Sequence, residues 1–417
     1  MNDTLKTAIG GAQILFVAFG ATVLVPLLTG LNPSLALLGA GIGTLIFQFV
    51  THREVPIYLG SSFAFIAPII YSVQTWGMPA TLGALAAASF FYYVAAGLVK
   101  WRGVEFIHRI LPPVVIGPVV MVIGLGLAPV AVGMASGKAG TNQVVPYATA
   151  ISLAAIALFT TMLVAIKARG IMKLVPILAG VAAGYIAALF MGAVNFQPVI
   201  DAPWFALPQF GKPEFNLAAI LFMIPVAIAP IVEHVGGILA IGSVTGKDFT
   251  ERPGLHRTLL GDGLAVNVVG LFGGPPVTTY GEVTGAVMLT RNFNPVVMTW
   301  AACFAILLAF VAKFGAFLNT IPLPVMGGIM LLLFGSIASI GLKTVMEGKV
   351  DLGDPRNLCI ISVVLVTGIG GLAVNFSDSF GLSGVSLCGI LAILLNLLLP
   401  RAVPQPVSDS VEARERP

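Results

Sequence analysis

Runs of about 20 apolar residues follow one another along almost the whole chain, and they constrain the fold more than any other feature. A helix needs about 20 such residues to cross the hydrocarbon core of a bilayer. Charged residues make up 9% of the chain, against about 25% in soluble domains. The sequence therefore predicts an all-α polytopic membrane protein.

This criterion gives fourteen transmembrane segments. The first seven are expected at residues 10–29, 34–50, 56–73, 78–99, 105–135, 147–166 and 174–193. The second seven are expected at residues 215–240, 256–272, 275–290, 295–312, 317–342, 356–374 and 382–400. Because fourteen is an even number, both termini should lie on the same side of the membrane.

The basic residues predict which side that is. With these spans, eighteen of the 21 Lys and Arg residues fall on the side of the N-terminus, and only Lys138, Lys212 and Lys313 fall opposite. Cytoplasmic loops carry the excess of Lys and Arg in membrane proteins. We therefore expect both termini in the cytoplasm. The polar, Pro-rich tail at residues 403–417 is predicted to be disordered.

The stretch from Gly273 to Arg291 interrupts this helical pattern. It opens with two Gly and two Pro residues, continues with the strand-favouring Val277–Tyr280, and becomes helical again after Gly281. Non-helical backbone at membrane depth is tolerated only where protein buries it or where it lines a cavity. Secondary transporters build their substrate sites from such broken helices. We therefore predict a binding site in this stretch.

An internal repeat supports this prediction. The third span opens with residues 56–63, which are extended and then helical, as in the tenth span. The Pro-rich start at Pro113 in the fifth span likewise resembles the one at Pro324 in the twelfth. Seven spans in each half is an odd number, so the halves should be inverted relative to one another. We predict a 7+7 inverted repeat in which the broken spans 3 and 10 carry short extended strands.

Three acidic residues lie within the predicted spans: Glu233, Asp262 and Glu282. A charge at membrane depth is costly and is usually functional. Glu233 is expected to be a buried carboxylate that can exchange a proton and hydrogen-bond a ligand rich in N–H and C=O groups. Glu282 adjoins the broken backbone, and both residues are candidates for proton coupling. Asp262 is expected to make structural hydrogen bonds.

Further candidates surround these carboxylates. His234 should point about 100° away from Glu233 round the helix and act as a packing residue. The half-helix starts at Phe63 and Gly281 expose N–H groups, which can donate hydrogen bonds to a ligand carbonyl. The Phe63 ring offers a stacking face, and Tyr280 either stacks on the ligand or packs the junction.

The chain resembles the nucleobase–ascorbate transporter family, and within it the bacterial uracil permeases. The motifs that carry the resemblance are Phe19–Pro26, Tyr58–Phe65, Glu233–Gly236, Thr278–Glu282 and Ile321–Gly328. The resemblance implies a core domain of spans 1–4 (residues 1–103) and 8–11 (residues 214–313). It implies a gate domain of spans 5–7 (residues 104–200) and 12–14 (residues 314–402). It also implies proton symport of a nucleobase across the inner membrane, usually by a homodimer with an elevator-like movement of the core.

The family's ligand contacts fall on Ala21, Phe63, Glu233, Gly281 and Glu282. The chain departs from the family pattern at three positions, which hold Ile14, Gly237 and Val283 where His, His and Asn are common. Gly237 lies one turn from Glu233 on the same helix face. The missing imidazole should leave a space that water, a neighbouring side chain or a bulkier ligand fills.

We therefore predict a nucleobase importer, specific for uracil or a related pyrimidine and coupled to protons, with no other cofactor and no nucleic-acid partner. Within transport, the alternatives are a purine or xanthine carrier, a weakly coupled facilitator, and a carrier of inorganic or dicarboxylate anions. Glu282 argues against an anion carrier, which would favour a cation at that position. Outside carriers, the alternatives are an intramembrane enzyme with Glu233 and Glu282 as acid and base, and a channel, for which no ring of filter carbonyls is visible.

Overall fold

The computed structural model of the chain describes residues 3–377 and 380–400, and within these ranges a few residues, Glu282 among them, are described by their backbone alone.

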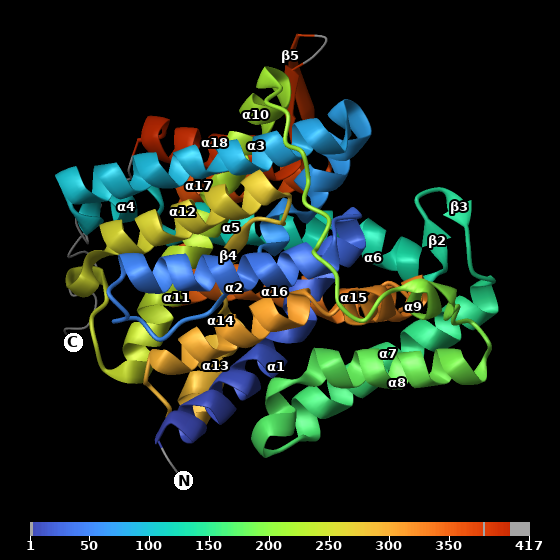
Figure 1. The fold of residues 1–417 in the computed structure, drawn as a ribbon. Helices are drawn as coiled ribbons and strands as arrows, with labels where there is room; N and C mark the ends of the chain where they lie inside the picture. The colour runs from blue at the N-terminus through green and yellow to red at the C-terminus, as the bar shows by residue number, and fades with distance from the viewer. Residues whose placement is uncertain (1–2, 378–379, 401–417) are drawn as a thin grey trace, which may run out of the picture.

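Helices make up most of the molecule (Figure 1). The α-helices are α1 (Asp3–Thr29), α2 (Pro33–Val50), α3 (Ile66–Arg102), α4 (Val104–Ile110), α5 (Pro113–Gly126), α6 (Ala128–Ala135), α7 (Tyr147–Lys167), α8 (Pro176–Phe190), α9 (Gln197–Asp201), α10 (Leu217–Met223), α11 (Ile228–Thr245), α12 (Leu255–Phe272), α13 (Gly281–Thr290), α14 (Val296–Ala309), α15 (Ala312–Leu318), α16 (Leu323–Glu347), α17 (Pro355–Ile369) and α18 (Gly384–Leu398). Short helical turns are η1 (Phe63–Phe65), η2 (Gly170–Leu174), η3 (Ile224–Ala227) and η4 (Thr250–Gly254), and the strands are β1 (Leu59–Ser61), β2 (Lys138–Ala139), β3 (Asn142–Gln143), β4 (Val277–Thr279), β5 (Ala373–Ser377) and β6 (Phe380–Ser383).

The structure confirms a mostly helical polytopic membrane protein at the level of helix length and composition. Seven helical segments among the described residues are long and apolar enough to cross a membrane, or eight if the bent pair α14 and α15 is one span. The longest, Phe63–Arg102, contains two predicted spans, which meet at the non-helical Gly77. The count of fourteen spans stays a prediction.

Several predicted spans are divided in the structure. The stretch 105–135 forms three helices, α4, α5 and α6, because Pro113 and Pro129 each stand in the first turn of a new helix. Proline has no N–H to donate and therefore favours the first turn over a helix interior. The stretch 317–342 begins in α15, which is bent by 87° from α14, and its long helix α16 starts only after Pro322.

The helices pack as two groups that share few close contacts. In one group α3 packs against α12 and α10, and α14 packs against α1 and α2. In the other, α16 packs against α5, α6 and α7, and α17 packs against α5 and α18. In the second group α16 and α5 cross closely at two glycines, Gly341 and Gly117. A Cβ added to Gly341 would lie 2.6 Å from the carbonyl oxygen of Gly117, so no side chain fits there.

The two extended segments that the sequence predicts are strands, and they pair with each other. β1 and β4 form an antiparallel ribbon in which Leu59 lies opposite Thr279, and Ser61 opposite Val277. Hydrogen bonds from Ser62 N–H to Pro276 O (2.8 Å) and from Tyr280 N–H to Tyr58 O (3.1 Å) extend the ribbon at both ends. Because the strands are antiparallel, α3 and α13 leave the ribbon in opposite directions.

Side chains from neighbouring helices complete the hydrogen bonds of the ribbon. The Thr44 hydroxyl on α2 accepts from Leu59 N–H at 3.0 Å, and the Ser61 hydroxyl donates to Thr22 O on α1 at 2.8 Å. The buried Tyr280 hydroxyl donates to Ser61 O at 2.9 Å. These contacts leave the ribbon fully enclosed by protein, as membrane depth requires.

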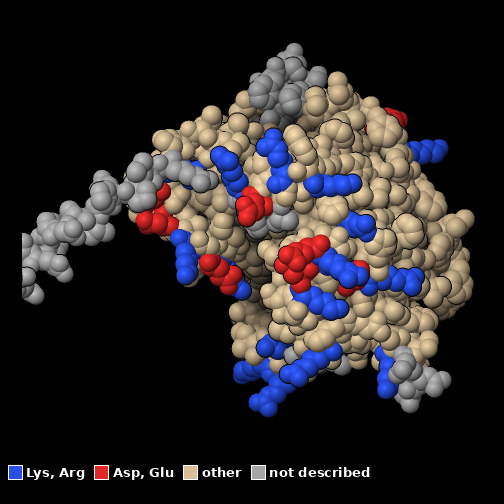
Figure 2. Space-filling model, turned by 90° about the vertical axis from the view of Figure 1, so that its left-hand side faces the viewer, with Lys and Arg blue, Asp and Glu red and all other residues tan. Residues whose placement is uncertain are grey.

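Two hairpins were not predicted from the sequence. β2 and β3 form one, on the side of the molecule away from both chain ends, and β5 and β6 form another between α17 and α18 (Figure 1). The predicted disordered tail at residues 403–417 lies outside the described residues. Figure 2 views the side of the molecule near the termini and shows Lys and Arg side chains gathered there.

The ribbon depends on a glycine. A Cβ added to Gly60 would lie 2.3 Å from the Tyr280 ring, so Gly60→Ala would force the two strands apart. Overpacking of this kind typically costs about 1–3 kcal/mol. We expect a clear fall in the melting temperature of the detergent-solubilised protein. Gly97→Ala on α3 is the matched control, because nothing lies within 4 Å of its added Cβ; equal melting of the two variants would contradict the argument.

Candidate functional site

Four parts of the chain meet at the β1–β4 ribbon. α1 reaches it through Thr22, the residue after Ala21. α11 reaches it at Gly237, whose added Cβ would lie 3.0 Å from the Thr279 hydroxyl oxygen on β4. α13 begins directly after the ribbon at Gly281, and η1 begins on the other strand at Phe63. The structure therefore brings together the elements that carry the predicted ligand contacts.

α11 presents two chemically different faces beside the ribbon. Glu233 is exposed, whereas His234, the next residue, is fully buried. Consecutive residues lie about 100° apart round a helix, so the two side chains point to different surroundings. The expectation that Glu233 is a buried carboxylate is therefore wrong for this conformation, because its side chain is exposed.

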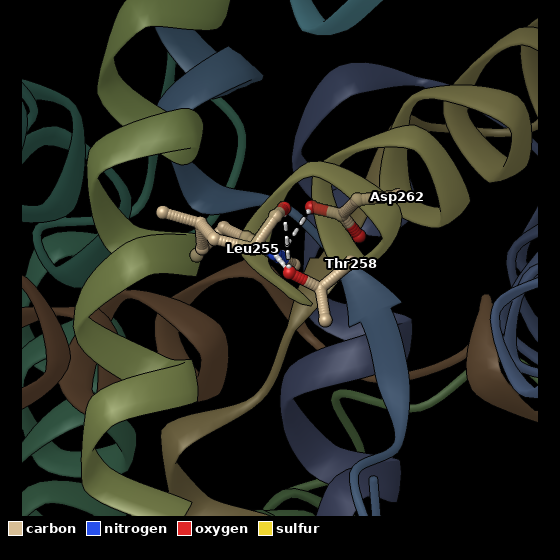
Figure 3. A network of polar contacts seen from close by, with 4 residues as sticks. Leu255, Thr258 and Asp262 are labelled. Atoms are coloured by element: carbon tan, nitrogen blue, oxygen red, sulfur yellow. Dashed lines mark hydrogen bonds and ion pairs between the residues drawn. The ribbon is translucent and has the colours of Figure 1, made fainter. Parts of the chain in front are cut away.

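His234 belongs to a buried polar network between α11 and α12. Figure 3 labels the residues of this network on α12, Leu255, Thr258 and Asp262. The Nε2 of His234 lies 3.0 Å from the Thr258 hydroxyl, and its Nδ1 lies 3.1 Å from Oδ2 of the fully buried Asp262. The second contact is within ion-pair distance but outside hydrogen-bond geometry. His234 is buried between the helices, as expected for a packing residue. Asp262 is buried too, but no hydrogen bond between described residues uses its carboxylate oxygens, so the hydrogen bonds expected of it are not seen.

The hydroxyl of Thr258 determines the tautomer of His234. It donates its only hydrogen to Leu255 O at 3.0 Å, so it must accept from Nε2–H of the imidazole. The other ring nitrogen, Nδ1, then faces Oδ2 of Asp262, so the imidazole is held between two residues of α12.

The remaining predicted contacts differ in accessibility. Gly281 is exposed, and nothing lies within 4 Å of an added Cβ there. Ala21 and Phe63 are 1% and 8% exposed, and Tyr280 is 2% exposed with its ring packed on Gly60. Of the two roles predicted for Tyr280, packing of the junction is the one seen in this conformation. The side chain of Glu282 lies outside what the structure describes.

The space expected beside Gly237 is occupied. Thr279 lies against it, with its hydroxyl oxygen 3.0 Å from the added Cβ position. Of the three occupants considered, a neighbouring side chain is therefore the one present. Two other departures from the family pattern, Ile14 and Val283, are buried apolar residues.

Sequence reasoning missed the hydroxyl groups of the ribbon. Thr278 and Thr279 are both 1% exposed, and no hydrogen bond between described residues uses either hydroxyl. Buried hydroxyls are normally paired, so these two can each still accept or donate a hydrogen bond; consecutive strand residues point to opposite faces, and only Thr279 lies against Gly237. The run Thr278–Thr–Tyr280 at membrane depth was the signal that could have identified them.

Comparison with known proteins agrees with the motifs. A model of the Permease family matches residues 5–376. The chain belongs to this family. Its members include the nucleobase–ascorbate transporters that the motifs indicated, so the protein is a transporter and not an enzyme.

Relatives match along nearly the whole of this permease. It is 61% identical over 401 residues to a probable uracil permease of Haemophilus influenzae, covering 96% of both chains. It is 46% identical to the uracil permease of Bacillus caldolyticus (97% of this chain, 94% of the relative). It is 41% identical to the uracil permease of Escherichia coli (94% and 91%).

Solved structures share the fold at much lower identity. The transmembrane domain of the cyanobacterial bicarbonate transporter BicA aligns with a TM-score of 0.63 at 16% identity, covering 94% of the permease and 96% of that chain. Murine Slc26a9, an anion transporter in an inward-facing state, aligns with a TM-score of 0.67 at 12% identity, covering 95% and 68%. These similarities concern the fold alone.

The His234 network makes a direct prediction for stability. Thr258→Val keeps the shape of the side chain but leaves Nε2–H of His234 buried without a partner, which costs about 1–3 kcal/mol. We expect a lower melting temperature for Thr258→Val in detergent and a nearly unchanged one for Thr258→Ser, which keeps the hydroxyl. Indistinguishable melting of the Val and Ser variants would show that the hydroxyl does not hold His234.

Proposed function

We propose that this permease imports uracil or a closely related pyrimidine across the bacterial inner membrane. The observation that carries the proposal is the identity of 41–61% to uracil permeases over more than nine-tenths of the chain. The exposed Glu233 beside the ribbon supports it. A pyrimidine offers both N–H donors and carbonyl acceptors, and a carboxylate can accept from those N–H groups.

The substrate site lies between α11 and the start of α13. Glu233 accepts hydrogen bonds from the ring N–H groups, and the free N–H groups at the start of α13, at Gly281, donate to a ring carbonyl. Ala21 and Phe63 supply apolar surface beside the ribbon. The close approach of Thr279 to Gly237 favours a single-ring base, because it removes the extra room that a purine would need.

Transport is coupled to a proton, with Glu233 and Glu282 as the coupling carboxylates and no other cofactor. Glu233 is exposed in this conformation, and a movement that enclosed it would favour its neutral form. Glu233 would then take up a proton when the site closes, keeping one oxygen as acceptor for a ring N–H group.

The two packing groups correspond to a core and a gate that move against one another as an elevator. The core comprises residues 1–103 and 214–313, and the gate residues 104–200 and 314–402, with seven spans in each inverted half. The sparse contacts between the groups support this division. The basic face near the termini supports cytoplasmic termini (Figure 2). The working unit is a homodimer.

A transport assay tests this proposal. The purified permease in proteoliposomes should accumulate radiolabelled uracil when the outside is acidic, and a protonophore should abolish the accumulation. Competition with unlabelled thymine, cytosine, xanthine and adenine then ranks the affinities of the permease for these bases. Uptake of uracil no greater than in protein-free liposomes would reject the function, whereas uptake that ignores the pH gradient would reject only the coupling.

Removal of the Glu233 carboxylate should weaken substrate binding. Hydrogen bonds to a charged partner contribute about 1.5–3 kcal/mol, so Glu233→Ala should raise the dissociation constant for uracil by roughly ten- to a hundredfold. Calorimetry on the detergent-solubilised protein measures this change. Glu347→Ala is the control, because Glu347 pairs with Lys343 on the surface of α16. Equal affinity in the two variants would exclude Glu233 from the site.

The coupling role of Glu282 has a separate test. Glu282→Gln keeps the size of the side chain but cannot titrate. We expect it to bind uracil and to exchange internal for external uracil, while uptake driven by a pH gradient disappears. Gradient-driven accumulation at the wild-type level in this variant would assign the coupling proton to another group.

A further inference from the structure

Two connections join the packing groups on the side of the molecule away from the chain ends. The first group contains α1, α2, α3, α10, α12 and α14, and the second contains α5, α6, α7, α16, α17 and α18, with α8 packed on α7 and α16. One connection runs from α8 to α10 through α9, and the other runs from α14 to α16 through α15. α9 and α15 pack against each other (Figure 1), so the two connections are in contact.

A single cation contacts both connections. Lys313, in the first turn of α15, donates from its Nζ to the carbonyl oxygen of Val199 in α9 at 2.9 Å. The same Nζ lies 5.4 Å from the centroid of the Trp204 ring, within the range of a cation–π contact. Lys313 therefore holds two points of the first connection to the start of α15.

Backbone hydrogen bonds strengthen this contact. They run from Ala206 N–H to Phe310 O and from Ala312 N–H to Trp204 O, both at 3.1 Å. A backbone bond closed at both sides of one residue pair fixes the direction of the chain as well as its position. The segment after α9 is therefore fastened along the end of α14 and the start of α15.

The same segment stays bonded to the first group until α10 begins. Gly211 N–H donates to Phe272 O at the end of α12 at 3.0 Å, and Glu214 N–H donates to Pro79 O of α3 at 2.9 Å. We call residues 199–214 the strap. Since its bonds go to α3, α12 and the end of α14, the strap is part of the first group, although it follows helices of the second.

α15 also lies on the first group. A Cβ added to Gly315 would lie 2.6 Å from the hydroxyl oxygen of Ser34 on α2. α15 meets the second group at its end, where the ring centroid of Phe317 lies 5.1 Å from that of Tyr185 on α8. Just after α15, the Thr320 hydroxyl lies 2.7 Å from the Tyr185 hydroxyl. The second connection therefore passes from one group to the other at the end of α15.

The first connection makes the same passage just before the strap. Ala193 and Val194 pack against the buried cluster that contains Leu153 of α7 and Ala188 of α8. Residues 195–198 therefore separate the part of the chain that lies on the second group from the strap that lies on the first.

We propose that Lys313 makes the strap and α15 one unit that moves with the first group, and that residues 195–198 and 319–322 are the hinges. When two groups move against each other, a few residues at the ends of elements absorb the change in backbone angles. This inference rests on the movement of the two groups in the proposed function. It assigns α15 to the first group, although the resemblance places residues 314–402 in the gate.

Hydrogen exchange tests the role of Lys313. Lys313→Met keeps an unbranched side chain but removes the donor. Because a hydrogen bond from a charged group is lost, the amides of the strap should exchange roughly tenfold or more faster in detergent. Lys212→Met is the matched control, because Lys212 is an exposed residue of the same strap. Equal exchange in the two variants would overturn the proposal. This measurement needs no transport, so it is decisive whatever the substrate.

Two engineered disulfides test which parts move together. The backbone bonds of the strap flank Phe205 and Val311, and residues flanked in this way in an antiparallel pair have Cα atoms about 4.5 Å apart, within disulfide range. Phe205→Cys with Val311→Cys therefore ties the strap to the second connection. Gly20→Cys with Ile177→Cys ties α1 to α8, across the groups, because the Cβ position of Gly20 lies 3.4 Å from Cβ of Ile177. Both pairs are made after replacement of the native cysteines by alanine, at Cys303, Cys359 and Cys388.

Uracil uptake into proteoliposomes before and after oxidation is the readout. We expect the disulfide within the strap unit to leave uptake unchanged. The disulfide between the groups should reduce uptake to the level of protein-free liposomes until dithiothreitol restores it. Loss of uptake with the strap disulfide, reversed by dithiothreitol, would overturn the proposal alone. Unchanged uptake with both disulfides closed would instead reject the movement of the two groups, and the hinges with it.

Discussion

The need to pair every backbone N–H and C=O at membrane depth determines how this permease is built. Helices meet that need alone, whereas β1 and β4 meet it by pairing with each other and by bonds to neighbouring side chains. The β1–β4 ribbon joins residues that are far apart in the sequence, and Thr44 and Ser61 bond it to α2 and α1. The irregular backbone therefore fixes the relative positions of α1, α2, α3 and α13, and the candidate site lies where these elements meet.

α11 carries the proposed binding residue and a structural contact one step apart along the helix. Glu233 is exposed, whereas His234 contacts Thr258 and Asp262 of α12 inside the protein. A helix whose next residue is bonded inside the protein cannot rotate freely, so this buried contact sets the orientation of the backbone at Glu233.

Much of this arrangement could be predicted from the sequence, because it depends on local patterns. Apolar length predicted the long helices, and the run of Gly, Pro and β-branched residues at 273–279 predicted the strand. Contacts between distant segments could not be predicted. Nothing near Gly237 in the sequence shows that Thr279 fills the space beside it, and the exposure of Glu233 depends on which helices face α11. The bend between α14 and α15 lies in apolar sequence, where no turn residue indicates it. The β5–β6 hairpin lies in the short polar stretch between two predicted spans, where the sequence indicated a loop but not which strands pair.

The ribbon has a consequence for biosynthesis. Its strands come from opposite halves of the chain, and the Tyr280 hydroxyl bonds a carbonyl 219 residues earlier. While the ribosome completes the intervening segments, the N–H and C=O groups of residues 59–61 have no strand to pair with. The first half must therefore stay beside the insertion machinery, or keep water at that depth, until β4 arrives. A polypeptide cut within the extended loop after α9 would leave each fragment with half a ribbon, and each fragment would become stable only by capturing the other.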